Sequence, residues 1–253
     1  MDDESSPPIS DPPIAANPGS PTLAERSVAL IEILLCSDYP TQFALAATFA
    51  TLGFRPQGAD GTLNIGFVAV LSLADTVFLV ALIVAFLRSH GENVREVFLG
   101  DRPILAEIRA GLPMTVAVYA IALVVLATTR VIAPWLRTVE QNPLQDLMKT
   151  PLHALIFAVV VVVAGGVREE LQRAFLLRRF EQALGGRTVG VVVASIGFGL
   201  GHWVQGADAM VATALLGAFW AIVYLRRRSV VAPMVSHAGF DLLQIVQFLA
   251  LGR

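Results

Sequence analysis

The sequence contains few of the residues that soluble proteins present to water. Only 15% of its 253 residues are charged, whereas a soluble domain carries about 25%. Cysteine occurs once, at Cys36, which excludes an internal disulfide. All but one of the 18 basic residues are arginine, the exception being Lys149. The formal net charge is −2, so there is no electrostatic case for a nucleic-acid partner.

The sequence is rich in apolar residues, and these occur in long runs. They make up 55% of the chain, and about 20 in succession suffice to cross the hydrocarbon core of a bilayer. We therefore predict an all-α, polytopic transmembrane helix bundle. It would have about seven spans, or eight if an interruption at Asp38 and Pro40 separates a re-entrant element. The seven runs lie near 27–53, 64–87, 112–136, 151–168, 188–203, 207–225 and 230–251.

The chain divides by composition into a tail and a membrane domain. Residues 1–22 are acidic and Pro-rich and lack the apolar run of a signal peptide, so we predict a disordered tail. Residues 23–253 form the predicted multi-span domain. Arginine is concentrated in the connections 88–111, 178–187 and 226–228, which the positive-inside rule assigns to the cytoplasm. This predicts a cytoplasmic N-terminus, and the abundance of Arg, Ala, Gly and Val suggests a bacterial inner membrane.

An acidic pair and an arginine follow one another at the end of the fourth run. Ionisable side chains within membrane spans are costly and by default mark function. Residues four apart share a helix face, so Glu169 and Arg173 face the same way, and Glu170 and Arg173 do so slightly less well. Arg173 would pair with one glutamate while the other faces a cavity. The alternative is a solvated helix cap formed by Arg168, Glu169 and Glu170.

Two histidines stand in later apolar runs. His237 and Asp241 are four apart on one helix face, where a carboxylate can orient an imidazole. His202 lies at the end of the fifth run. Taken alone, each histidine could instead be a hydrogen-bonded core residue. Two further acids in apolar runs would serve substrate or proton binding, or else buried hydrogen bonding: Asp38 and Asp75.

Together these groups make up a hydrolytic site, with an acid as general base, imidazoles and a polar partner. The chain has no contiguous His-Glu-x-x-His helix, but ligands on separate helices of a bundle can converge. His202 and His237 could then bind zinc together with a carboxylate. A mechanism in which a glutamate activates water without metal is also compatible with these residues.

The motifs resemble those of the CPBP intramembrane metalloproteases, the family of the CAAX-processing Ras-converting enzymes. The family pattern is Glu-Glu-x-x-x-Arg, Phe-x-x-x-His and His-x-x-x-Asn/Asp. Phe198 with His202 fits the second motif, and His237 with Asp241 fits the third. The likeness covers roughly residues 90–251, with the catalytic core at about 151–251. It implies that His202 holds the activated water or a metal and that His237 and Asp241 stabilise the oxyanion.

The first motif departs from the family pattern, because two residues rather than three separate Glu170 from Arg173. Counting back from Arg173 places Arg168 where the family has its first glutamate, which is taken as the general base. The base is then Glu169, or Glu170 through a local shift in the helix, or absent. We favour Glu169 as the base with Glu170 in support.

The leading hypothesis is an intramembrane endopeptidase that cuts a membrane protein or lipidated peptide near the cytoplasmic side of the lipid bilayer. The shortened glutamate motif motivates a first alternative, a non-catalytic relative that acts as a membrane chaperone, immunity or scaffold protein. The intramembrane acids motivate a second, a proton-coupled transporter, which the lack of internal repeats disfavours. The sequence carries no signal for the oligomeric state or for prenylation of the substrate.

Overall fold

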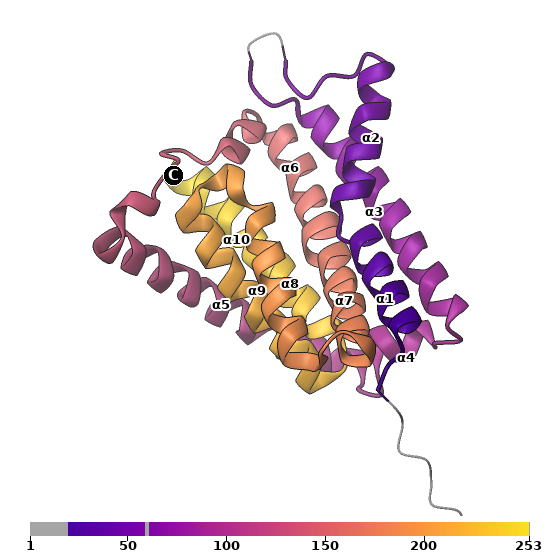
Figure 1. Ribbon diagram of the computed structural model, residues 1–253. Coiled ribbons are helices and arrows are strands. Elements are labelled where there is room, and N and C mark those ends of the chain that lie inside the picture. The colour runs from indigo at the N-terminus through magenta and orange to yellow at the C-terminus, as the bar shows by residue number, and fades with distance from the viewer. Residues whose placement is uncertain (1–19, 59–60, 253) are drawn as a thin grey trace, which may run out of the picture.

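A computed structural model describes residues 20–58 and 61–252, and within these ranges the protein is a bundle of helices without a named strand (Figure 1). The all-α class is confirmed. The predicted tail lies outside the described residues, apart from its last three. The main helices are α1 (Leu23–Leu35), α2 (Tyr39–Thr51), α3 (Ile65–Ser89), α4 (Val94–Leu99), α5 (Ile104–Ile132), α6 (Pro151–Val160), η3 (Val161–Glu169), α7 (Glu170–Ala183), α8 (Gly186–Gly201), α9 (Ala207–Arg227) and α10 (Val231–Leu251). Three short 3-10 turns complete the list: η1 (Pro134–Leu136), η2 (Pro143–Met148) and η4 (Trp203–Gln205).

Five stretches of the described chain are long and apolar enough to cross a membrane alone. A sixth results if α1 and α2, which are bent by 42° relative to each other, count as one span. The remaining predicted run corresponds to α8, which is apolar but has only 16 residues, fewer than the ~20 of a full span. The five stretches are Ile65–Ser89, Val94–Ile132, Pro151–Ala183, Ala207–Arg227 and Val231–Leu251.

The interruption predicted in the first run is the bend between α1 and α2. Asp38 ends the break with φ of +79°, a conformation that is uncommon for residues other than glycine. Pro40 follows in the first turn of α2, where its missing N–H leaves no helical hydrogen bond unmade. The carboxylate of Asp38 makes no capping bond to the backbone of α2; its Oδ2 accepts a hydrogen bond from Gln42 Nε2 at 2.6 Å, and its Oδ1 binds Arg168.

The fourth run continues as one helical rod well beyond its predicted span. α6, η3 and α7 follow one another without a break from Pro151 to Ala183. The middle piece, η3, is a π-helix, in which each turn holds an extra residue and which often occurs at functional sites. It ends at Glu169, so the wide turn lies directly before Glu170 and sets the directions in which the two acids point.

Glycines allow the helices around this rod to approach closely. A Cβ atom added to Gly166 in η3 would lie 2.6 Å from the Cβ of Ala238 in α10. A Cβ at Gly199 in α8 would lie 2.8 Å from that of Ala214 in α9. Small residues at such contacts let backbones pack tightly in membrane bundles, and they bring the polar residues of η3, α8 and α10 together.

The three arginine-rich connections lie at one end of the bundle. Arg227 pairs with Glu107, with an Nη2–Oε1 distance of 2.8 Å, and Arg228 pairs with Glu181, with an Nη1–Oε2 distance of 2.8 Å. The start of α1 lies at this end too, whereas the chain between α5 and α6 and the end of α10 lie at the other (Figure 1). This is the arrangement that the positive-inside prediction requires.

Candidate active site

The two adjacent glutamates have different environments. The side chain of Glu170 is 1% exposed and binds both the guanidinium of Arg173 and Nδ1 of His237, the latter at 2.8 Å from its Oε1. The side chain of Glu169 is 18% exposed. Successive residues on a helix point about 100° apart, so one acid is buried while the next reaches a cavity. Arg173 thus pairs with Glu170, three residues before it, rather than with Glu169, four residues before it.

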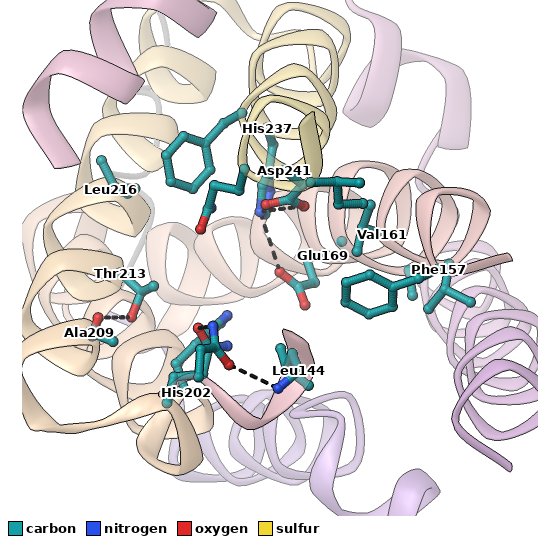
Figure 2. Close-up of a pocket in the computed structure, with 18 of the residues that line it drawn as sticks. Leu144, Phe157, Val161, Glu169, His202, Ala209, Thr213, Leu216, His237 and Asp241 are labelled. Atoms are coloured by element: carbon teal, nitrogen blue, oxygen red, sulfur yellow. Dashed lines mark hydrogen bonds and ion pairs between the residues drawn. The ribbon is translucent and has the colours of Figure 1, made fainter. Parts of the chain in front are cut away.

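His237 is surrounded by carboxylates. Its Nδ1 contacts Glu170, and its Nε2 lies 3.8 Å from Oε2 of Glu169 and 3.8 Å from Oδ2 of Asp241. Figure 2 shows the last two contacts as dashed lines converging on the ring. When Nδ1–H donates to Glu170, Nε2 is the nitrogen that faces the cavity. The i, i+4 pair predicted from the sequence therefore shares its site with both glutamates.

Aromatic rings hold the imidazoles in place. Trp220 in α9 stacks on His237. Phe198 contacts His202 edge-on, with ring centroids 4.8 Å apart, and His237 with centroids 5.9 Å apart, while the guanidinium of Arg173 lies 4.5 Å from its ring centre. Sequence reasoning missed Trp220. Tryptophans of membrane proteins are enriched at the membrane–water interfaces. A tryptophan in the middle of an apolar run was therefore the sequence feature that could have indicated a special role for Trp220.

His202 enters the pocket from a different side than His237 (Figure 2). It stands at the C-terminal end of α8, where its Nδ1 lies 2.8 Å from the carbonyl oxygen of Phe198. Donation of Nδ1–H to that carbonyl leaves Nε2 available to the cavity. The four-residue spacing of Phe198 and His202 thus orients the histidine through the helix backbone as well as through the ring contact.

Arg168 links three helices to the acidic pair. Its guanidinium binds Asp38 at the start of α2, Asp75 of α3 at 2.6 Å, and Glu169 at 3.2 Å. Arg168 is 4% exposed and Asp75 is fully buried, so the alternative of a solvated helix cap is wrong. Asp38 and Asp75 have the buried hydrogen-bonding role that was one of their two expected roles. The sequence could have indicated this cluster, because Arg168 is a basic residue in an apolar run and Asp38 and Asp75 are acids in apolar runs that lacked an evident partner.

Two cavities meet at Glu169. The first has a volume of about 330 Å³ and is reached by His237 and Asp241. The second has a volume of about 400 Å³ and lies among α1, the start of α2, α7 and α8. Both are lined by Glu169 and His202, which therefore stand at their junction. The other residues lining both are Leu144, Arg168, Phe198 and Gln205.

A glycine makes room for Asp241 in the first cavity. A Cβ added to Gly165 would lie 2.7 Å from Oδ2 of Asp241, closer than real contacts allow. The absence of a side chain in η3 thus lets the carboxylate of α10 approach His237. Asp241 occupies the position that is asparagine or aspartate in the resembled family.

The predicted metal site needs a set of convergent ligands. Among residues 20–58 and 61–252 no group of three or more His, Cys, Asp and Glu side chains is placed to hold a metal ion. His202 and His237 enter from different sides (Figure 2). As arranged, these side chains do not fit a zinc ion. Zinc at His202 and His237 stays a prediction.

The chain between α5 and α6, which lies at the arginine-poor end of the bundle, contributes to the site. α8 begins beside the arginine-rich connection 178–187 and ends at Gly201, directly before His202. Three residues later, Gln205 accepts a hydrogen bond at 3.3 Å from Asn142, which lies between α5 and α6. Residues of that segment line the first cavity. His202 therefore lies at the end of α8 opposite the arginine-rich connection. The predicted orientation of the N-terminus and the predicted site near the cytoplasmic side stay predictions.

Comparison with known proteins adds a family to this geometry. A family model described as Rce1-like, type II CAAX prenyl endopeptidase Rce1-like, matches residues 151–243. The segment runs from α6 into α10 and contains every predicted site residue: Glu169, Glu170, Arg173, His202, His237 and Asp241. The match confirms the predicted resemblance, and with the apolar helices it supports a membrane-embedded protease. No curated protein and no solved structure matches the chain.

Proposed function

We propose that this protein is an intramembrane endopeptidase in which Glu169 activates the attacking water. The observation that carries the proposal is the place of Glu169 at the junction of two cavities, beside His237 and Asp241. A general base must reach the proton that it removes, directly or through one water. Glu170 is buried between Arg173 and His237 and lines neither cavity, whereas Glu169, which contacts Arg168, is partly exposed and lines both.

The two histidines take complementary roles in this proposal. His202 and Glu169 line the same two cavities, so a water between them can donate one hydrogen bond to Nε2 of His202 and lose its other proton to Glu169. The carbonyl of the scissile bond then becomes an oxyanion. His237, in its doubly protonated form, donates Nε2–H to that oxyanion while Nδ1–H donates to Glu170. Glu169 finally returns its proton to the leaving amine.

The surroundings favour this charge separation. Glu170 and the stacked ring of Trp220 hold His237 in one orientation before substrate arrives. Donors that are fixed in advance need no reorganisation as charge develops, and in a low-dielectric site they act more strongly than in water. Asp241, 3.8 Å from Nε2, either favours the charged imidazole or, when protonated, donates a second hydrogen bond to the oxyanion.

Peptide cleavage by the detergent-purified protein tests the proposal. Internally quenched transmembrane peptides, with and without a prenyl group, are incubated with the wild type and with Glu169→Gln. We expect Glu169→Gln to lower the cleavage rate at least about 100-fold, as is typical when a general base is lost. The matched control is Glu181→Gln, which changes the same group at the arginine-rich end and should keep the wild-type rate. Equal rates for wild type and Glu169→Gln would refute Glu169 as the base.

The same samples separate the remaining alternatives. Metal analysis of wild type and of the variant His202→Ala/His237→Ala tests the predicted zinc. A non-catalytic scaffold is favoured if no peptide is cut and the cellular function survives replacement of both Glu169 and Glu170. The side of the membrane on which products appear in reconstituted vesicles tests the prediction that the bond is cut near the cytoplasmic side.

A further inference from the structure

We infer, resting on the proposed peptidase function, that the substrate is an uncharged apolar stretch of polypeptide that continues on both sides of the scissile bond. A chain end with a free carboxylate close to that bond would be a poor substrate. The inference follows from the two cavities at Glu169 and from the charges that line them.

The first step is that the site has room on both sides of the base. The first cavity, about 330 Å³, and the second, about 400 Å³, each fall in the size range of ordinary ligand pockets. Because Glu169 and His202 line both, a bond held between these two side chains has one flank in each cavity. A substrate that ended at the bond would leave one cavity unfilled.

The second step concerns the walls of the second cavity, where apolar side chains lie beside amides and the ion-paired groups of Arg168 and Arg173. α7 forms its floor with Leu176 and Phe180, and α1 and α8 supply Ile33 and Val193. Gly197 also lines it, and a Cβ there would meet no atom within 4 Å. Apolar side chains of a membrane-embedded segment therefore match this cavity, whereas a charged flank would lose its hydration.

The third step is that neither cavity offers a free permanent cation. Of the described residues that line them, only Arg168 and Arg173 are lysine or arginine. Arg168 already binds Asp38, Asp75 and Glu169, and Arg173 binds Glu170. Proteins that recognise a carboxylate usually present an arginine fork to it. Here both forks are occupied, so an entering carboxylate would be desolvated without a counter-charge, at a large cost.

The fourth step is that the first cavity offers neutral amides instead. Asn142 and Gln145 of the chain between α5 and α6, Gln205 of η4 and Gln244 of α10 all line it. A carboxamide both donates and accepts hydrogen bonds, which suits the N–H and C=O groups of an unbroken peptide backbone. The polar groups of this cavity thus fit continuing main chain better than a charged terminus.

A matched peptide pair tests the inference. One quenched apolar sequence is made with a C-terminal amide and with a free acid, ending two residues beyond the cleaved bond, and a longer pair ends ten residues beyond it. We expect the short acid to be cut at least ten-fold more slowly than the short amide, and the long pair to be cut equally. Equal rates for the short pair, or a preference for the short acid, would overturn the inference.

A cation added to the first cavity should change the preference. Gln145→Arg places a guanidinium in the cavity, and Gln145→Met is the control of similar length without charge. We expect Gln145→Arg to raise the acid-to-amide ratio of the short peptides at least five-fold and Gln145→Met to leave it unchanged. An unchanged ratio in Gln145→Arg would count against the inference.

Binding keeps this test separate from that of the peptidase itself. Fluorescence anisotropy of the labelled short pair on wild-type protein measures affinity whether or not the bond is cut. Tighter binding of the amide with no cleavage would overturn the proposed function and uphold this preference. Cleavage that depends on Glu169, together with tighter binding of the free-acid peptide, would uphold the proposed function and overturn this preference.

Discussion

Trp220 stacks on His237 with ring centroids 3.9 Å apart and planes 19° from parallel. Trp220 is 1% exposed, and its Nε1–H donates to the hydroxyl oxygen of Ser236, next to His237 in α10, at 3.3 Å. The indole therefore fixes both the ring and the backbone neighbour of the proposed oxyanion donor. Several measurable consequences arise from this and from the other contacts of the site.

Replacing Trp220 should affect cleavage and stability together. Trp220→Ala leaves a cavity beside His237, and large-to-small changes of this kind cost about 3–5 kcal/mol. Trp220→Phe keeps a ring against the imidazole and should cost less in both thermal unfolding and cleavage rate. Wild-type cleavage by Trp220→Ala would show that the stack does not position His237.

The two glutamates should separate in their effects on stability. Glu170→Gln removes the charge that Arg173 and His237 share in a buried place, and breaking a buried pair costs about 3–5 kcal/mol. Glu169→Gln changes a partly exposed acid, and we expect a much smaller change in unfolding temperature. The measurement is thermal unfolding of both variants in one detergent. The reverse order of stability would contradict the assignment of Glu170 as the structural acid.

The Arg168 cluster should behave as a coupled unit. Arg168→Met leaves Asp75 buried without a counter-charge, so we expect a loss of about 3–5 kcal/mol. The double variant Arg168→Met/Asp75→Leu removes both charges and should recover much of that loss. A double-mutant cycle of unfolding free energies measures the coupling. Additive losses would mean that the pair contributes nothing as a pair.

Close helix packing at Gly166 should make that position intolerant of a methyl group. A Cβ there lies 3.1 Å from the backbone nitrogen of Ala238, and forced overpacking costs about 1–3 kcal/mol. Gly197→Ala is the control, because its Cβ meets no atom within 4 Å. We expect thermal unfolding to shift downward for Gly166→Ala alone.

A polar cluster at the arginine-rich end should contribute pH-dependent stability. Burial opposes ionisation of Glu92, but hydrogen bonds from Arg179 and Arg178 outweigh it, so the pKa of Glu92 lies below its ordinary value. A lowered pKa in the folded state gives stability that is present above the ordinary glutamate pKa of about 4.3 and is lost as the pH falls through the folded-state pKa. Glu92→Gln should flatten this acid limb of the unfolding temperature, while Glu140→Gln, an exposed acid at the other end, should not.

The sequence by itself determined the helical class, the positions of the main spans and the chemical inventory of the site. Hydropathy is a local property, because a segment of about 20 apolar residues forms its backbone hydrogen bonds within itself in any surroundings. The i, i+4 spacing of His237 and Asp241 is likewise local, and it brought these two side chains onto one face of α10. The shortness of α8 was also present in the sequence, as a glycine-rich run.

Only the tertiary structure decided which acid does what. The π-helix η3 ends at Glu169; Glu170 pairs with Arg173 and His237 of α10, whereas Glu169 lines the cavities. Arg168 and Asp75 are 93 residues apart in sequence, and Trp220 reaches His237 from another helix. Such contacts depend on which helix faces pack together. Helix periodicity within one segment predicts the face on which a side chain lies, but the residue that it contacts on another helix is determined only by the tertiary structure.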